Sequence, residues 1–298
     1  MATTETEVPG QNFGFIGFGD MGAPMDGNLA ANSDESQIQL SVFDIALNRD
    51  RVPASAIIAE SLADIAATTD IAFMSVPDGD SSIDVVKSLL DTRESRLRCL
   101  INLSTVGIPA SHQIAEMIPQ DSFEYVDAPV SGGKSGAVNA TITVMWSGSR
   151  TYFDDLQPLL STFAKSVFYV GNNAGQGQAL KLLNNYLSGV AMTASSEAVR
   201  FGLHHGLDLK TLLDVVHVST GQNMAISDKF PKRILTESFD AGFRMQLMEK
   251  DISLYRQGVE AAGLPASILT EVARYWERGV EQFPDGDFTE IFKLIDVD

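Results

Sequence analysis

The chain is poor in cysteine and in basic residues, and it lacks long apolar runs. Cys99 is the one cysteine among 298 residues, so no internal disulfide can form. No stretch of about 18 uninterrupted apolar residues occurs, which argues against a membrane span. The first residues, MATTETEVPGQ, are acidic and polar, and they fit neither a secretory signal nor a transit peptide. Together these features predict a cytoplasmic protein.

The scarcity of basic residues also limits the possible partners. The 21 Lys and Arg residues face 39 Asp and Glu residues, which gives a formal net charge of −18. A surface this acidic repels phosphate backbones and anionic lipids, so we expect neither nucleic acid nor a membrane as a partner. Cations that bind an anionic ligand must then be gathered in its site. Hydrophobic residues make up 44% of the chain, enough for a full core, and the length predicts about two domains.

The first part of the chain alternates short apolar segments with helical patterns. The predicted strands are 12–16, 39–43, 71–76, 99–103, 123–127, 141–146 and 167–170. The predicted helices are one from Gly22 to about Ala31, one from Ser61, and those over 82–90 and 108–117. This alternation with short connections predicts the α/β class with a largely parallel, doubly wound sheet.

Only helical patterns follow Gly171. They cover 176–204, 209–216, 224–230, 248–262 and 267–282. The sequence therefore predicts a nucleotide-binding sheet domain over 1–172. An all-helical substrate and oligomerisation domain is expected over 173–298, and a long interdomain helix joins the two.

A glycine-rich segment follows the first predicted strand and begins the first predicted helix. It reads Gly17-Phe18-Gly19-Asp20-Met21-Gly22, and Asp44 ends the second predicted strand. Glycines at this spacing permit a tight turn, the close approach of a pyrophosphate and helix–strand packing, and the helix N-terminus favours the phosphates. A carboxylate at the end of the second strand binds the adenosine ribose. The pattern favours a Rossmann-type dinucleotide site over a glycine-rich turn beside a surface aspartate.

Asp44 also bears on the choice of cofactor. Its carboxylate would repel the 2′-phosphate of NADP, so NAD is favoured. NADP remains possible because Arg49 lies only five residues later.

A lysine lies in the otherwise apolar helix predicted over 176–204. Lys181 and Asn185 are four residues apart and therefore share one face of the helix. Lysine is rarely buried, and desolvation lowers the pKa of a buried amine from about 10.4 toward the range of a general base. Such an amine can accept a hydroxyl proton while hydride leaves the carbon. The spacing alone leaves open a surface lysine on the polar face of an amphipathic helix.

Four segments together resemble the β-hydroxyacid dehydrogenase family, which includes 3-hydroxyisobutyrate dehydrogenase and tartronate semialdehyde reductase and is 6-phosphogluconate dehydrogenase-like. In family order they are 14–22 (GFIGFGDMG), 127–133 (DAPVSGG), 175–177 (GQG) with Lys181 and Asn184-Asn185, and 242–244 (GFR) with 250–252 (KDI). They span nearly the whole chain, and four such segments in order are specific.

The resemblance implies a role for each matching residue. It implies that Lys181 is the catalytic acid/base. Ser131, Gly132 and Gly133 are implied to bind the substrate carboxylate, with Asn185 and Phe243 also on the substrate side. The implied cofactor residues are Gly17, Phe18, Gly19, Asp20, Met21, Gly22, Asp44, Val76, Pro77, Thr105, Lys250 and Asp251. The family also implies a homodimer or homotetramer. No cysteine or histidine pair has the spacing of metal ligands, so we expect no metal site.

The chain departs from the family pattern after the substrate loop. Relatives often read glycine-threonine where this chain reads Asn139-Ala140-Thr141, a departure that affects the local turn rather than the chemistry. Lys134 directly follows the substrate glycines. It is interpreted either as a contact to an extra anionic group of the substrate or as a solvated loop lysine.

The sequence thus predicts an oxidoreductase that interconverts a small anionic 3-hydroxy acid and its semialdehyde or keto acid. Lys181 would exchange the proton and NAD(P) the hydride. Two alternatives keep the same scaffold. An imine reductase usually replaces the catalytic lysine, and a non-catalytic cofactor-binding paralogue should have lost the lysine or the substrate loop.

Overall fold

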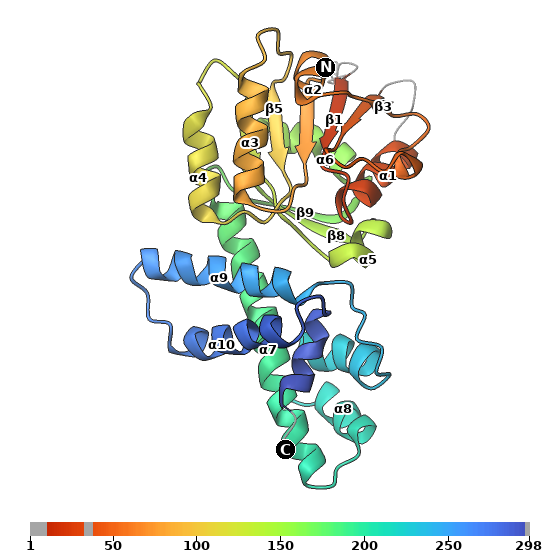
Figure 1. Ribbon diagram of the computed structural model, residues 1–298, viewed down its shortest axis with the longest axis vertical. Helices are drawn as coiled ribbons and strands as arrows, with labels where there is room; N and C mark the ends of the chain where they lie inside the picture. Colours follow the sequence, from red (N-terminus) through yellow and green to blue (C-terminus); the bar gives the residue numbers. More distant parts are fainter. Residues whose placement is uncertain (1–10, 33–37, 296–298) are drawn as a thin grey trace, which may run out of the picture. The chain divides into compact units, whose positions relative to one another are not determined.

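The computed structural model describes residues 11–32 and 38–295, and it divides the chain into two compact units (Figure 1). The N-terminal unit comprises Met1–Lys181 and the C-terminal unit Leu182–Asp298. The long helix α7 (Gln176–His204) begins in the first unit and continues in the second. The predicted domain boundary at 172/173 stays a prediction, since the compact units meet within α7.

The N-terminal unit is built on a nine-stranded sheet within the described residues. Its strands are β1 (Gln11–Ile16), β2 (Ile38–Phe43), β3 (Ile57–Ile58), β4 (Ile71–Met74), β5 (Cys99–Asn102), β6 (Glu124–Asp127), β7 (Val130–Ser131), β8 (Ile142–Ser147) and β9 (Ala164–Gly171). The order β3-β2-β1-β4-β5-β6 is parallel throughout. This is the doubly wound order of a Rossmann fold, so the predicted fold class is confirmed. β8 then runs antiparallel to β6 and β7, and β9 parallel to β8.

Helices cover the sheet and explain why its strands are apolar on both faces. They are α1 (Gly22–Asn32), the 3₁₀ turn η1 (Arg49–Arg51), α2 (Leu62–Thr68), α3 (Gly79–Leu90), α4 (Ile108–Met117), α5 (Gly133–Val138) and α6 (Arg150–Leu160). Phe13 and Phe73 belong to one hydrophobic core, whereas Ile16 and Met74 belong to another. Neighbouring residues of β1 and β4 therefore point into different cores, as in a parallel sheet buried on both sides. Figure 1 shows α3 and α4 side by side over one face.

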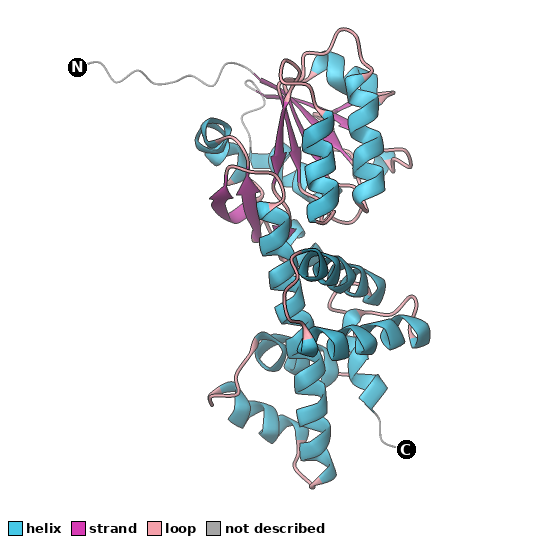
Figure 2. Cartoon of the chain, turned by 90° about the vertical axis from the view of Figure 1, so that its left-hand side faces the viewer, coloured by secondary structure: helices cyan, strands magenta, loops and turns pink. Residues whose placement is uncertain are grey.

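The C-terminal unit is helical, as predicted (Figure 2). Besides its share of α7 it contains α8 (Leu209–His217), the π-helix η2 (Ala225–Ile234), α9 (Met245–Ala261), α10 (Ser267–Gln282) and the 3₁₀ segment η3 (Phe288–Ile295). Its core gathers around the fully buried Trp276. The segment predicted as an ordinary helix over 224–230 is the wider η2, which contains Pro231. Proline has no N–H to donate, which interrupts an α-helical hydrogen-bond ladder. No described helix is both long and apolar enough to span a bilayer.

Asp26 places a buried carboxyl group in α1. The side chain is fully buried, and neither of its oxygens has a hydrogen-bond partner among the described residues. Burial raises the pKa of Asp26 to about 8, because a carboxylate is poorly solvated in an apolar interior. The folded protein therefore holds this carboxyl group mainly in its protonated form at neutral pH.

We expect Asp26→Asn to stabilise the protein more at pH 8 than at pH 5. The pKa is about 8 in the folded chain against an ordinary value of 3.8. The unfolded chain releases the proton first, so wild-type stability falls as the pH rises from about 4 to about 8. Over pH 5 to 8 the difference between variant and wild type should grow by about 3–4 kcal/mol in urea unfolding. The exposed Asp84→Asn is the control, and equal pH dependence of Asp26→Asn and wild type would contradict the account.

Candidate active site

The three glycines of the nucleotide loop have different neighbours. Gly17 has a φ of 92°, and a Cβ atom there would lie 2.2 Å from the Ser75 carbonyl oxygen. A Cβ on Gly22 would lie 1.9 Å from the Gly17 carbonyl oxygen. A Cβ on Gly19, in contrast, would meet no described atom within 4 Å. The fold itself requires glycine at 17 and 22, whereas Gly19 borders open space in front of the α1 N-terminus, which suits a pyrophosphate.

These neighbours predict opposite results for two alanine substitutions. Gly19→Ala should leave the free energy of unfolding within about 1 kcal/mol of wild type, because its backbone is not left-handed and its Cβ is free. It should weaken NADH binding by about tenfold or more, since the methyl group enters the space for the pyrophosphate. Gly22→Ala should lower stability instead. Urea unfolding and NADH fluorescence titration measure the two quantities, and unchanged NADH affinity in Gly19→Ala would contradict the placement of the pyrophosphate.

Asp44 is fixed at the end of β2 by two backbone N–H groups. Its Oδ2 accepts a hydrogen bond from Phe18 N at 2.5 Å, and its Oδ1 accepts one from Ala46 N at 2.7 Å. The carboxylate thus lies against the glycine loop. Arg51, which the sequence reasoning did not single out, donates from Nη2 to the Gly19 carbonyl oxygen at 3.2 Å.

The carboxyl ends of β4 and β5 hold the next predicted cofactor residues. Val76 N donates to the Oγ of the buried Ser104 at 2.9 Å. This bond joins the Val76–Pro77 turn to the segment that leads into Thr105. Ligands of open α/β sheets bind at the carboxyl ends of the strands, where these turns lie.

The buried carboxylate of Asp127, the last residue of β6, receives the beginning of α7. Its Oδ2 accepts hydrogen bonds from Gly175 N and Gln178 N, each at 3.1 Å. The Gln178 side chain donates to Oδ1 at 2.5 Å, and the Ser147 hydroxyl donates to Oδ2 at 3.3 Å. Burial raises the pKa of Asp127, and the hydrogen bonds from Gln178, Gly175 and Ser147 act in the opposite direction.

Gln178 extends this network to the turn that contains Thr105. Its Oε1 accepts from Val106 N at 2.9 Å and from Gly107 N at 3.1 Å. Its Nε2 donates to the Ser104 carbonyl oxygen at 3.0 Å. One fully buried side chain therefore ties β6, the end of β5 and the first turn of α7 together.

Lys181 lies three residues after Gln178 on α7. Its side chain is buried, with 8% of the residue exposed, and it has polar interactions within the structure. Because α7 is anchored through Gln178, the position of Lys181 relative to the strand ends is fixed.

The predicted substrate loop follows β7. Ser131 pairs with Thr143 of β8. Gly132 and Gly133 have φ values of 136° and 63°, which only glycine adopts easily. Gly133 then begins the short helix α5. Ala140 takes a left-handed φ of 53° after this helix, at the turn where the sequence departs from its relatives.

The Asp127 carboxylate accepts four hydrogen bonds, from Gly175 N, Gln178 N, the Gln178 side chain and the Ser147 hydroxyl. Asp127→Asn should lower the free energy of unfolding by about 2–4 kcal/mol, because an amide cannot accept all four of them. It should also lower kcat, since the start of α7 loses its anchor. Urea unfolding and turnover with saturating substrates measure these effects. The exposed Asp154→Asn, on α6, serves as the control. A loss of stability no larger than that of the control would contradict the anchoring role.

In the C-terminal unit, Asp251 joins two other predicted site residues. Its Oδ2 accepts from Asn185 Nδ2 at 2.5 Å, and its Oδ1 lies 3.5 Å from Lys250 Nζ. Asn184 Nδ2 donates to Asn185 Oδ1 at 3.1 Å. The Asp251 side chain is 4% exposed and that of Lys250 29%. Asp251 is thus placed to orient its neighbours, a function that the sequence did not suggest.

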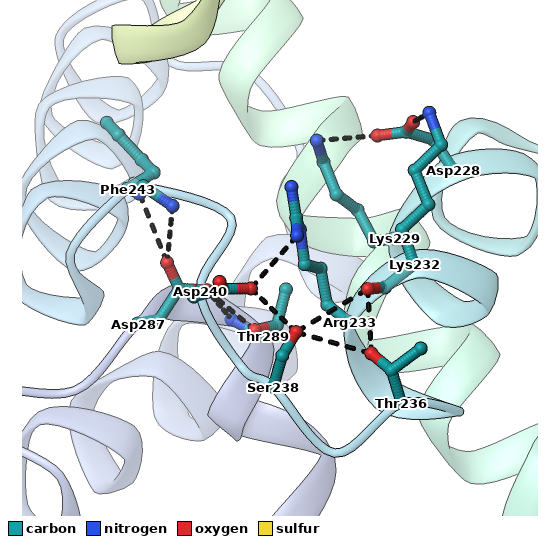
Figure 3. A network of polar contacts seen from close by, with 11 residues as sticks. Asp228, Lys229, Lys232, Arg233, Thr236, Ser238, Asp240, Phe243, Asp287 and Thr289 are labelled. Carbon is teal, nitrogen blue, oxygen red and sulfur yellow. Dashed lines mark hydrogen bonds and ion pairs between the residues drawn. The ribbon is translucent and has the colours of Figure 1, made fainter.

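Phe243 is positioned separately by a second, partly buried network (Figure 3). Asp287 Oδ2 accepts hydrogen bonds from Gly242 N at 2.8 Å and Phe243 N at 3.2 Å. Asp287 Oδ1 accepts from Thr289 N and Oγ1. The Phe243 ring meets Phe288 edge-to-face with centroids 5.8 Å apart.

The structure therefore groups the predicted residues into sets. The glycine loop with Asp44, the two strand-end turns and Lys181 belong to the first unit, while Asn185, Lys250 and Asp251 form one cluster of the second. Sequence reasoning missed Arg51, Ser104 and Gln178 as supporting residues. A glutamine on the apolar helix was the available signal for Gln178. Among the described residues, no group of three or more His, Cys, Asp or Glu could hold a metal ion.

Two protein families match the two parts of the chain. Residues 12–171 match the family described as the NAD binding domain of 6-phosphogluconate dehydrogenase. Residues 175–295 match the family described as NAD-binding of NADP-dependent 3-hydroxyisobutyrate dehydrogenase. These matches define the chain as a nicotinamide-dependent oxidoreductase, which confirms the predicted class of enzyme and cofactor.

Individual relatives are similar over nearly their full length. The 2-(hydroxymethyl)glutarate dehydrogenase of Eubacterium barkeri is 31% identical, over 89% of this chain and 88% of the relative. The NAD-dependent L-serine dehydrogenase of Pseudomonas aeruginosa is 28% identical, with 95% and 97% covered. The solved 3-hydroxyisobutyrate dehydrogenase of Mycobacterium tuberculosis, with L-serine, has a TM-score of 0.86 at 26% identity, with 96% and 99% covered. The chain belongs to the β-hydroxyacid dehydrogenase family, as predicted.

Imine reductases share the fold at greater distance. The enzyme of Streptomyces aurantiacus has a TM-score of 0.62 at 17% identity, over 96% of this chain and 100% of that one. Identity this low shows a common fold only, so the dehydrogenase interpretation is favoured over the imine reductase alternative.

Proposed function

We propose that this protein interconverts a small 3-hydroxy acid and its semialdehyde or keto acid, with NAD as the favoured cofactor and Lys181 as the general acid/base. The observation that carries this proposal is a buried lysine on α7, anchored through Gln178 and Asp127 to the carboxyl ends of β5 and β6. Lysine is rarely buried, and buried ionisable groups are concentrated at functional sites.

The substrate carboxylate would bind to Ser131, Gly132 and Gly133. The serine hydroxyl and the successive backbone N–H groups of a glycine turn converge on an anion as a nest does. Left-handed φ values at both glycines support this interpretation. In a chain with a net charge of −18, backbone donors also avoid the need for many local cations.

Lys181 would hold the substrate hydroxyl oxygen and exchange its proton. In oxidation the neutral amine accepts the hydroxyl proton as the C–H bond gives up its hydride. In reduction the ammonium returns that proton to the carbonyl oxygen. The nicotinamide, when bound, supplies the hydride acceptor or donor. Asp251 would keep Asn185 turned toward the substrate by accepting its amide N–H.

The residues of the nucleotide loop fit a dinucleotide. Open space at Gly19 suits the pyrophosphate, and Asp44 at the end of β2 suits the adenosine ribose. NAD is favoured because this carboxylate would repel a 2′-phosphate. Arg51 beside the loop leaves NADP as a second cofactor.

The substrate class follows from the relatives. Their names specify 2-(hydroxymethyl)glutarate, L-serine and 3-hydroxyisobutyrate, which are all small acids with a hydroxyl group on the β-carbon. We extend this class, and no single member of it, to the present chain. A cytoplasmic location and a homodimer or homotetramer are parts of the same proposal.

Lys181→Met tests the proton-transfer role. It removes the amine and keeps most of the aliphatic stem, so turnover of 3-hydroxy acids should fall by about 10²–10⁴-fold. NADH affinity should change little, because the amine exchanges a proton with the substrate. Absorbance of the reduced nicotinamide and fluorescence titration measure these quantities. Lys165→Met, at an exposed position of β9 in the same unit, is the control. Turnover in Lys181→Met close to that of the control would contradict the assignment.

A further inference from the structure

Lys134 and Asp20 form an ion pair between two loops of the N-terminal unit. Lys134 Nζ lies 3.1 Å from Asp20 Oδ1, although the residues are 114 positions apart in the chain. Asp20 stands between Gly19 and Met21 in the nucleotide loop, two residues before α1 begins at Gly22. Lys134 is the second residue of α5, directly after the predicted substrate glycines.

Contact between α1 and α5 supports this juxtaposition. Asn28 of α1 donates from Nδ2 to the carbonyl oxygen of Ala137 at 2.7 Å, which joins α1 to α5. This bond joins the second half of α1 to the last turn of α5, and the two helices pack against each other. Lys134 therefore contacts Asp20 from a helix that packs against α1.

The pair contributes little to stability. The two side chains are 53% and 57% exposed, and exposed ion pairs of this kind contribute at most about 1 kcal/mol. The position of Asp20 nevertheless has a consequence for binding. A carboxylate before the first turn of α1 is favoured by the helix dipole, and it competes with any other anion for the same N–H groups.

We propose that Lys134 is a cofactor-site residue whose ammonium group neutralises Asp20, so that the doubly negative pyrophosphate can bind at the glycine loop. This inference rests on the proposed dinucleotide site. In the absence of Lys134, an unpaired carboxylate would remain beside the pyrophosphate in a protein that already carries a net charge of −18. Arg51 Nη2, bonded to the Gly19 carbonyl oxygen, is a second cation at the same loop and does not contact Asp20 in any described bond.

This role differs from the interpretation of Lys134 as a contact to a second anionic group of the substrate. Charge neutralisation predicts an effect on the dissociation constant of the cofactor in the absence of substrate. A substrate contact predicts an effect on the KM for an acid with two carboxylates and none on cofactor binding. The two roles are therefore separable by measurement.

The experiment compares NADH dissociation constants, from isothermal titration calorimetry without substrate, for wild type, Lys134→Met, Asp20→Asn and the double variant. Lys87→Met is the matched control. It removes a similarly exposed ion pair, Lys87–Asp84, in the last turn of α3. That end of the helix is remote from the strand ends at which α3 begins.

Lys134→Met should weaken NADH binding by about 5- to 20-fold, the range expected for one unit charge a few ångströms away in partly solvated surroundings. The double variant should recover to within about threefold of wild type, because it lacks the carboxylate that requires neutralisation. Lys87→Met should bind as wild type does. The loss in Lys134→Met should also shrink at about 1 M salt, where charges are screened.

Unchanged NADH affinity in Lys134→Met would overturn the inference, and a raised KM for a dicarboxylic hydroxy acid would then assign Lys134 to the substrate. Loss without recovery in the double variant would also overturn it, since Lys134 would then act on the cofactor without Asp20. Failure of the wild type to bind NADH would instead overturn the proposed dinucleotide site. The failures of the two proposals are thus distinguishable.

Discussion

The buried carboxylate of Asp127 is the group on which the arrangement of the active site depends. It accepts backbone N–H groups at the start of α7 and the side-chain amide of Gln178. A buried carboxylate without such partners would be costly, so these hydrogen bonds hold the first turn of α7 against the end of β6. Gln178 transmits this constraint to the turn at Val106. These bonds therefore also determine the position of Lys181, which lies three residues after Gln178 on α7.

The sequence was sufficient to predict those strands and helices that have a regular hydrophobic pattern. The strands of the parallel sheet are apolar on both faces, and α4 and α10 begin and end where their patterns predicted. The sequence was insufficient to predict short or irregular elements. β7 has two residues, α5 begins in a glycine-rich loop, and α6 contains Pro158, so none of these gives a periodic signal. The π-helical form of η2 also lacks a sequence signature that we could recognise.

The candidate site divides in the same way. Motifs were sufficient to nominate the residues that would touch ligands, such as Lys181 and Asp44. Motifs did not identify the residues that hold the ligand-binding residues in place. Partners such as Gln178 and Asp127 are distant in sequence, and the hydrogen bond between them depends on the fold. The pairing of Lys134 with Asp20 is of this kind. The sequence left open whether Lys134 contacts an extra anionic group of the substrate or is a solvated loop lysine, and it did not indicate the partner in the nucleotide loop.

The most direct test of the proposed mechanism is a crystal structure of the protein with NAD and a non-reacting analogue of a 3-hydroxy acid. The account predicts that the analogue's carboxylate lies on Ser131–Gly133 and that its hydroxyl oxygen lies about 3 Å from Lys181 Nζ. It also predicts that the hydrogen bonds of Asp127 to α7 are preserved. An analogue bound elsewhere, or a Lys181 ammonium group out of reach of the hydroxyl oxygen, would contradict it.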